Sequence, residues 1–188
     1  NNSILSGGAI GGGLFLLDTV QVGSNGIAFA YLVALNPTAN NAIELRNVDG
    51  SSINVGQFEI AGAGFNGIRV HNGSSTDVTI DSALIENTGV AGIELNGSTG
   101  SFTINGGVVN LTGGDAVNIT GGTGAVTIGA GLRKTTAGHL VEVNGHSTGN
   151  VVFSANLDAL NLSNGILINN SSGNIDFSGT GKELSTGA

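Results

Sequence analysis

Residues 91–138 read AGIELNGSTGSFTINGGVVNLTGG followed by DAVNITGGTGAVTIGAGLRKTTAG, which are two copies of one pattern. Each copy has an apolar–polar–apolar triplet, a polar turn containing Asn or Gly, a second such triplet and a Gly-rich remainder. Self-similarity at a fixed period of 20 to 50 residues is typical of repeat proteins. The 24-residue period therefore predicts a fold built from stacked copies of this unit.

The same pattern extends over residues 41–188 in six units of 24 or 25 residues, which begin at Asn41, Asn66, Ala91, Asp115, His139 and Asn164. The first triplets are 43–45, 68–70, 93–95, 117–119, 141–143 and 166–168, and the second are 53–55, 78–80, 102–104, 126–128, 151–153 and 175–177. Alternate residues of a strand point to opposite sides, so the outer two residues of each triplet are predicted to point inward.

Two short strands cannot bury their own apolar side, whereas units stacked at about 4.8 Å share one continuous core. The prediction is an all-β, right-handed parallel β-helix of about seven coils with three strands per coil, where a coil is one full turn of the solenoid. The third side, with Phe58, Ile85, Val109, Leu132 and Leu157, slips by one residue between units, so its register stays open.

Residues 1–40 are less regular, and two interpretations are open. They form an irregular first coil, with strands at 14–16, 26–29 and 31–35 and a turn at Pro37, or they form an end cap. In either case the chain is expected to be a single β-helix domain over 1–188, with 41–188 as six regular coils.

The turns are expected to be structural. Gly100, Gly124, Gly149 and Gly173 each precede a second triplet, where a backbone with positive φ is predicted. Asn residues follow the first triplets, and their side chains are predicted to form hydrogen-bonded ladders between coils; they are Asn47, Asn72, Asn96, Asn144, Asn169 and Asn170.

The composition excludes several classes of protein. Charged residues make up 10% of the chain and hydrophobic residues 39%, which excludes ordinary disorder. Five basic and thirteen acidic residues give a net charge of −8, so nucleic acid is not an expected partner. The absence of Cys excludes disulfides and thiolate metal sites. No run of 18 apolar residues occurs, so membrane insertion is not expected.

The stretch AGIELNGSTGSFTI, residues 91–104, with the Gly-rich side that follows it, resembles the right-handed parallel β-helix repeats of large bacterial surface proteins. These include adhesin-like and autotransporter-passenger chains, often described as β-strand-repeat proteins. The resemblance covers residues 41–188 and implies an architecture. The same solenoid also carries pectinase-like enzymes and phage tailspikes, so the resemblance does not decide the function.

Two outward-facing carboxylates are candidates for carbohydrate chemistry. Glu44 and Glu94 are predicted to lie two coils apart, at about 9.6 Å, near the separation of the carboxyl groups in an inverting glycosidase. Arg69 is predicted to lie between them and to keep both ionised, which disfavours a general acid. A ladder of ion pairs between coils is therefore the favoured interpretation.

Asp77 and Asp81 are further candidates for contact with sugar. They are four residues apart, about 13 Å along a strand, too far to share one metal ion. His71, His139 and His146 have no metal-binding spacing and are interpreted as turn or surface residues. No metal, cofactor or catalytic residue is predicted.

The resulting functional hypothesis is a structural or adhesive extracellular module of a bacterial surface, and not an enzyme. Its expected partner is itself, through further coils of a longer chain or through head-to-tail copies that form a filament, with carbohydrate as a further partner. The alternative is a polysaccharide-binding or polysaccharide-cleaving β-helix that uses Glu44, Asp77, Asp81 and Glu94.

Overall fold

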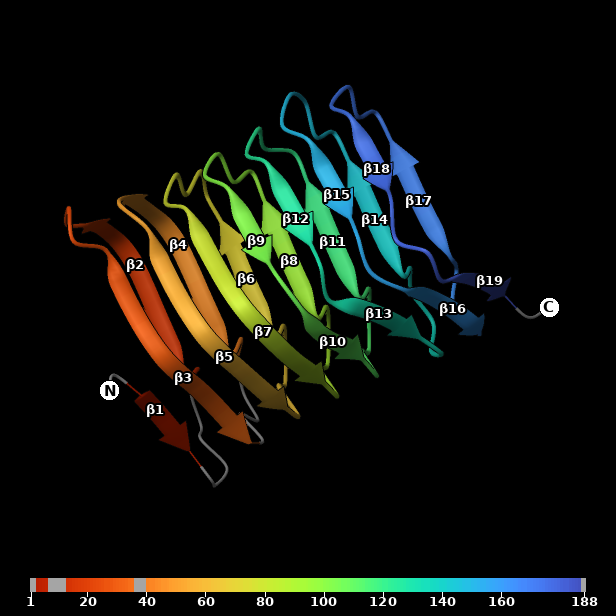
Figure 1. Cartoon of the computed structure of the whole chain (residues 1–188), viewed down its shortest axis with the longest axis horizontal. Helices are drawn as coiled ribbons and strands as arrows, with labels where there is room; N and C mark the ends of the chain where they lie inside the picture. Colours follow the sequence, from red (N-terminus) through yellow and green to blue (C-terminus); the bar gives the residue numbers. More distant parts are fainter. Residues whose placement is uncertain (1–2, 7–12, 36–39, 187–188) are drawn as a thin grey trace.

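A computed structural model describes residues 3–6, 13–35 and 40–186 of the chain. Within these residues all regular structure is β-strand, and no α-helix is present. Every strand pairing is parallel, and the strands fall into two sheets. The predicted fold class is confirmed, because the chain forms a parallel β-solenoid of about seven coils (Figure 1).

The first sheet contains one strand from each coil. Its seven strands in the described residues are β2 (Phe15–Val22), β4 (Ile43–Gly50), β6 (Ile68–His71), β8 (Ile93–Asn96), β11 (Val117–Thr120), β14 (Val141–Asn144) and β17 (Ile166–Asn169). They are stacked in chain order, so the sheet runs along the whole solenoid.

The second sheet contains the strands of the other two sides. Its twelve described strands are β1 (Ser3–Ser6), β3 (Ile27–Leu35), β5 (Ile53–Ala61), β7 (Val78–Glu86), β9 (Phe102–Ile104), β10 (Gly107–Asn110), β12 (Val126–Ile128), β13 (Gly131–Lys134), β15 (Val151–Phe153), β16 (Leu157–Asn161), β18 (Ile175–Phe177) and β19 (Lys182–Thr186). In the early coils one long strand, such as β5 or β7, serves both sides. After β7 the sheet divides: β9 pairs with the first part of β7, and β10 pairs with its last part.

The early part of the chain forms coils of the same solenoid. β2 pairs with β4 along seven residues, and β3 pairs with β5 along eight. Residues 13–35 are therefore a coil and not a separate cap, while β1 pairs with β3 as part of a preceding turn. Pro37 and most of residues 1–12 lie outside the described residues.

The register of the first two sides agrees with the sequence pattern. Ile43 pairs with Ile68, and Ile68 with Ile93, and the triplet positions stay aligned through β17. On the second side, Phe153 pairs with Phe177, and the two rings stack with centroids 5.1 Å apart. The inward-facing residues of all three sides form one continuous core.

The third side changes register by one residue, as the sequence suggested. Ile104 pairs with Ile128, and Val109 pairs with Leu132. Along the chain, Ile104 and Val109 are five residues apart, whereas Ile128 and Leu132 are only four residues apart. The corner between the second and third sides is therefore one residue shorter in the coils of β12 and β15, and it regains the residue between β18 and β19, where Phe177 and Lys182 are five residues apart. Leu132 still reaches the core position of Val109, because both are buried.

One corner of every coil requires a left-handed backbone. The residue four positions after the start of the first triplet has φ between 49° and 71° in seven successive coils, at Thr19, Asn47, Asn72, Gly97, Gly121, Gly145 and Asn170. Asn and Gly are the residues that adopt this conformation most readily. Asn47, Asn72 and Asn170 are thus found at this corner because the backbone there is left-handed. Among the described residues, a hydrogen bond between two Asn side chains joins the starts of two coils, where Asn66 Nδ2 donates to Asn41 Oδ1 at 2.9 Å.

The prediction of positive φ at the Thr-Gly and Ser-Gly turns is wrong. Gly100, Gly124, Gly149 and Gly173 do not have left-handed φ values. The reason for glycine is the close approach of the neighbouring coil. A Cβ atom on Gly124 would lie 2.0 Å from the carbonyl oxygen of Gly100, and one on Gly100 would lie 2.2 Å from that of Thr76.

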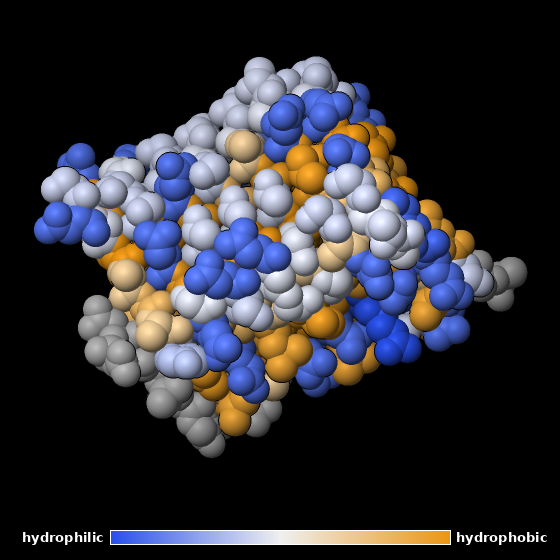
Figure 2. Space-filling view, viewed as in Figure 1, coloured by the Kyte–Doolittle hydropathy of each residue, from blue (hydrophilic) through white to orange (hydrophobic). Residues whose placement is uncertain are grey.

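The two ends of the described solenoid leave core positions open to solvent. Along one inward column of the first sheet, Leu45, Val70, Leu95, Ile119 and Val143 are buried, whereas Ile168 in β17 is 47% exposed. At the other end Phe15 and Leu17 of β2 are only partly buried. Figure 2 shows hydrophobic surface along the side of the molecule where β17 and β18 lie.

Candidate functional site

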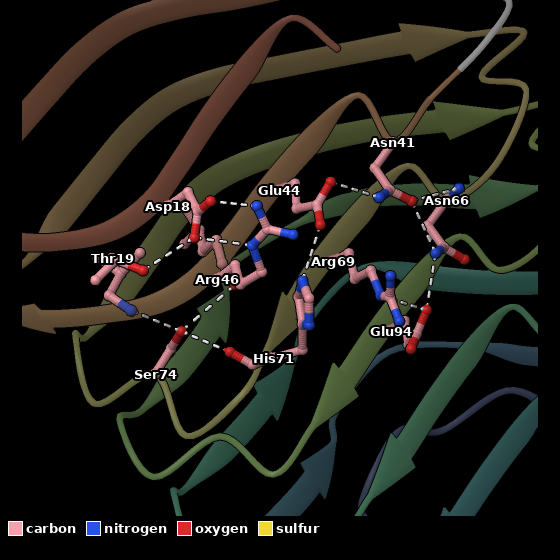
Figure 3. Close-up of polar contacts among 12 residues, drawn as sticks. Asp18, Thr19, Asn41, Glu44, Arg46, Asn66, Arg69, His71, Ser74 and Glu94 are labelled. Atoms are coloured by element: carbon pink, nitrogen blue, oxygen red, sulfur yellow. Dashed lines mark hydrogen bonds and ion pairs between the residues drawn. The ribbon is translucent and has the colours of Figure 1, made fainter. Parts of the chain in front are cut away.

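A row of polar side chains, here called the polar ridge, follows the outer face of the first sheet and the turns that lead into it. It contains Asn41, Glu44, Asn66, Arg69, His71, Glu94, Asp115, Asn118, His139 and Glu142. Parallel pairing places Glu44, Arg69, Glu94, Asn118 and Glu142 in one file, as predicted. Figure 3 shows the first half of the ridge, in which the side chains contact one another within a coil and between neighbouring coils.

Glu44 is held by two side chains of the ridge. Asn41 Nδ2 donates to Glu44 Oε2 at 2.9 Å, and His71 Nε2 lies 2.9 Å from Glu44 Oε1 (Figure 3). Partial burial alone would raise the pKa of Glu44, but the hydrogen bonds from Asn41 and His71 and the nearby positive charge outweigh it and lower the pKa below 4.5. A carboxyl group with a lowered pKa is ionised at neutral pH and cannot act there as a general acid.

Arg69 contacts one of the two glutamates and not both. Its Nε lies 3.1 Å from Glu94 Oε2, and Asn66 Nδ2 donates to the same oxygen at 2.8 Å. Glu44 is instead contacted by His71. Of the predicted ladder of ion pairs, the described residues contain the Arg69–Glu94 pair, and His71 adds a contact with Glu44 that sequence reasoning did not include.

Asp77 and Asp81 lie on the outer surface at the second side, and each is bound by the next coil. Ser101 donates to Asp77 Oδ1 through its backbone nitrogen, at 2.8 Å, and through its hydroxyl, at 2.7 Å. Asn105 Nδ2 donates to Asp81 Oδ1 at 3.1 Å. The four predicted site residues thus lie on two different sides of the solenoid and do not converge on one point.

Two shallow hollows adjoin these carboxylates. One, of about 270 Å³, is lined by Asn54, Thr79 and Asp81. The other, of about 320 Å³, is lined by Val90, Ala91, Glu94, Gly114, Asp115 and Asn118. The second hollow lies where Ala91 starts a coil. The other coils of residues 41–188 carry Asn, Asp or His at that position, so the small side chain leaves room beside Glu94 and Asp115.

The second half of the ridge contains a cluster that sequence reasoning missed. His139 Nδ1 lies 3.4 Å from Asp115 Oδ1 and 3.4 Å from Glu142 Oε2. The three side chains are 15–23% exposed. Asp115 and His139 are 24 residues apart in the chain, and the signal that could have found them is the repeat period itself, which makes residues i and i+24 neighbours.

The other two histidines are buried, and the interpretation as turn or surface residues agrees with the structure only in placing His146 in a turn. His71 ends β6 and is buried. His146 lies in a corner and is 1% exposed; its Nδ1 and Nε2 are each 3.1 Å from a carbonyl oxygen, of Gly121 and Gly149 respectively. Both side chains contribute polar contacts within and between coils.

Comparison of the chain with protein-family models, with curated proteins and with solved structures gave no match. In the part of the chain that the structure describes, no helix is long and apolar enough to cross a bilayer. The argument for function therefore rests on the solenoid and its surface.

Proposed function

We propose that the chain is a structural or adhesive solenoid module of a bacterial cell surface, which acts by stacking with further coils. The observation that carries the proposal is the open last coil. Ile168 continues a column of buried residues but is itself 47% exposed, and the partly buried Phe177 continues the column of buried Phe153.

An open coil favours the addition of another. The edges of β17, β18 and β19 present unpaired backbone groups, and an incoming parallel strand would pair with them. Full burial of one large apolar side chain stabilises by about 1.5–3 kcal/mol. The occupant we propose is a coil of the same kind, from a second copy of this chain.

The outward-facing carboxylates of the polar ridge and of the second side support a structural role. Glu44, Glu94, Asp77 and Asp81 each accept hydrogen bonds from a side chain on their own or a neighbouring coil. Contacts of this kind fix the register of stacked strands. An extracellular location fits the low content of charged residues and the resemblance to surface-protein repeats.

Self-stacking is tested by sedimentation velocity over a wide concentration range, with electron microscopy of the same samples. The wild-type chain is expected to associate end to end, and Ile168→Asp is expected to abolish association because it places a charge in the exposed end column. Leu162→Asp is the control, since Leu162 is 71% exposed and lies outside that column. A wild-type chain that stays monomeric without fibres would contradict self-stacking.

Carbohydrate binding is the second candidate, favoured by the hollow that Asn54, Thr79 and Asp81 line. A panel of acidic and neutral polysaccharides tests it by affinity electrophoresis and by product analysis. On our proposal no polysaccharide is shortened. Retardation lost in Asp81→Asn would support carbohydrate binding, and chain shortening lost in Glu94→Gln would replace the structural proposal with an enzymatic one.

A further inference from the structure

We propose that Asp115, His139 and Glu142 form a binding site for one divalent transition-metal ion, with Zn²⁺ as the best-fitting probe. Each residue offers one ligand atom, and the three atoms lie within 4.8 Å of one another. Asp115 belongs to one coil, and His139 and Glu142 belong to the next, so the ion would join the two coils.

The distances fit a tetrahedral ion. Ligand bonds of about 2.0–2.1 Å place the ligand atoms of a tetrahedral site about 3.3–3.4 Å apart. His139 Nδ1 lies 3.4 Å from Asp115 Oδ1 and 3.4 Å from Glu142 Oε2. Two of the three ligand separations thus already have the required value, and a small rotation of the flexible Glu142 side chain adjusts the third.

The types of ligand select the class of metal. Ca²⁺ and Mg²⁺ are bound by oxygen atoms, whereas an imidazole nitrogen suits Zn²⁺, Cu²⁺, Ni²⁺ and Fe²⁺. One imidazole with two carboxylates is therefore a site for a transition metal. The partial exposure of the three side chains leaves the fourth position for water or for a group of a partner.

Neighbouring groups hold the ligands in place. The backbone nitrogen of His139 donates to Asp115 Oδ1 at 2.7 Å, and Asn118 Nδ2 donates to Asp115 Oδ2 at 2.8 Å. Thr120 Oγ1 in turn donates to Asn118 Oδ1 at 2.9 Å. Hydrogen bonds of this type orient the ligands of metal sites and contribute to their affinity.

The local charge also favours a cation. With a neutral imidazole the cluster carries two negative charges. Lys134 is near enough to attract Asp115, but its ammonium is turned inward and donates to the carbonyl oxygen of Thr112 at 2.7 Å. Glu94 on the preceding coil is already paired with Arg69. Beside Asp115, the hollow at Ala91 gives the site access to solvent.

The test is titration of the metal-free chain with ZnCl₂ at pH 7.5 by isothermal calorimetry, checked by equilibrium dialysis. We expect one Zn²⁺ per chain and a higher melting temperature with Zn²⁺ than with CaCl₂ at the same concentration. His139→Asn is expected to weaken binding by at least about tenfold. Asn begins three of the other coils, at Asn41, Asn66 and Asn164, so this variant is compatible with the fold. Glu142→Gln is expected to weaken binding as well.

The controls are His71→Asn, which makes the same change on another coil, and Asp81→Asn, which removes one negative charge elsewhere. Both are expected to bind Zn²⁺ as the wild type does, and circular dichroism verifies that each variant is folded. The proposal is wrong if the wild type binds no Zn²⁺, if His139→Asn binds it equally well, or if Ca²⁺ binds as tightly. In those cases the cluster is an ion pair or an unselective acidic patch. None of these readouts depends on end-to-end association.

Discussion

Lys134 is a cation placed inside the solenoid. It ends β13, pairs in register with buried Ala159, and has no exposed surface. Its ammonium donates to the carbonyl oxygen of Thr112 and to Thr136 Oγ1. Burial lowers the pKa of Lys134 below 10.5, and the charge of Asp115 opposes this shift only in part.

A lowered pKa of Lys134 makes stability depend on pH. Between the folded-state pKa and 10.5 the unfolded chain binds more protons, so the contribution of Lys134 to stability increases as pH rises through that interval. We expect Lys134→Met to remove this increase and to leave the free energy of unfolding at pH 7 unchanged or about 1 kcal/mol higher. Thr136 Oγ1 still donates to the Thr112 carbonyl in the variant.

Urea unfolding at pH 7 and pH 10 measures the effect of Lys134→Met, and Lys182→Met in the exposed β19 is the control. A loss of more than about 3 kcal/mol at pH 7 in Lys134→Met would show that the buried ammonium is needed for the fold.

At the scale of strands and turns, the distance between neighbouring coils is limited by glycine. Gly124 lies directly over the backbone of Gly100, and a Cβ there would meet its carbonyl oxygen at 2.0 Å. The backbone cannot move away from the preceding coil without breaking the hydrogen bond from Phe102 N to Ala125 O, 2.9 Å, which joins these two coils.

Gly124→Ala is therefore expected to lower the free energy of unfolding by about 1–3 kcal/mol. Gly23→Ala is the matched control, because a Cβ at Gly23 meets no atom within 4 Å and the position has no left-handed φ. The control is expected to stay within about 0.5 kcal/mol of the wild type. Chemical denaturation measures both variants, and equal stabilities would mean that the close contact is relieved without cost.

The strands were predictable where the side chains alternate. In triplets such as Ile43-Glu44-Leu45, a shift by one residue would turn both apolar side chains outward, so burial fixes the register. The third side lacks this constraint. Glycines at 106, 107, 129 and 131 flank its strands there, and the corner can gain or lose a residue while Val109 and Leu132 still reach the core.

The site was predictable only in part, for a related reason. The file of Glu44, Arg69 and Glu94 follows from the strand register. His71 lies two residues after Arg69, and His139 lies three residues before Glu142. The approach of these histidines to the carboxylates of the ridge therefore depends on turn geometry and side-chain conformation. The triplet pattern carries no information on either.

For the whole molecule, coils contact only their neighbours, so stability is approximately a sum of coil and interface contributions. Inner coils such as that of β11 have two covered faces, and the coil of β17 has one. The core is therefore weakest at the ends, where Ile168 and Phe15 are partly exposed. Any partner that covers an end coil would stabilise the chain from that end inward.

The direction of the hydrogen bonds between coils also gives the solenoid a mechanical property. The strands lie across the axis along which the coils stack, so the hydrogen bonds between coils run along that axis (Figure 1). Tension between the two ends then opens the bonds of one coil at a time, as in unzipping, instead of shearing many strands together. Each coil of 24 or 25 residues releases about 80 Å of chain when it detaches. A solenoid of this design is expected to lengthen in equal steps under low force, which single-molecule stretching measures; one abrupt high-force rupture would contradict it.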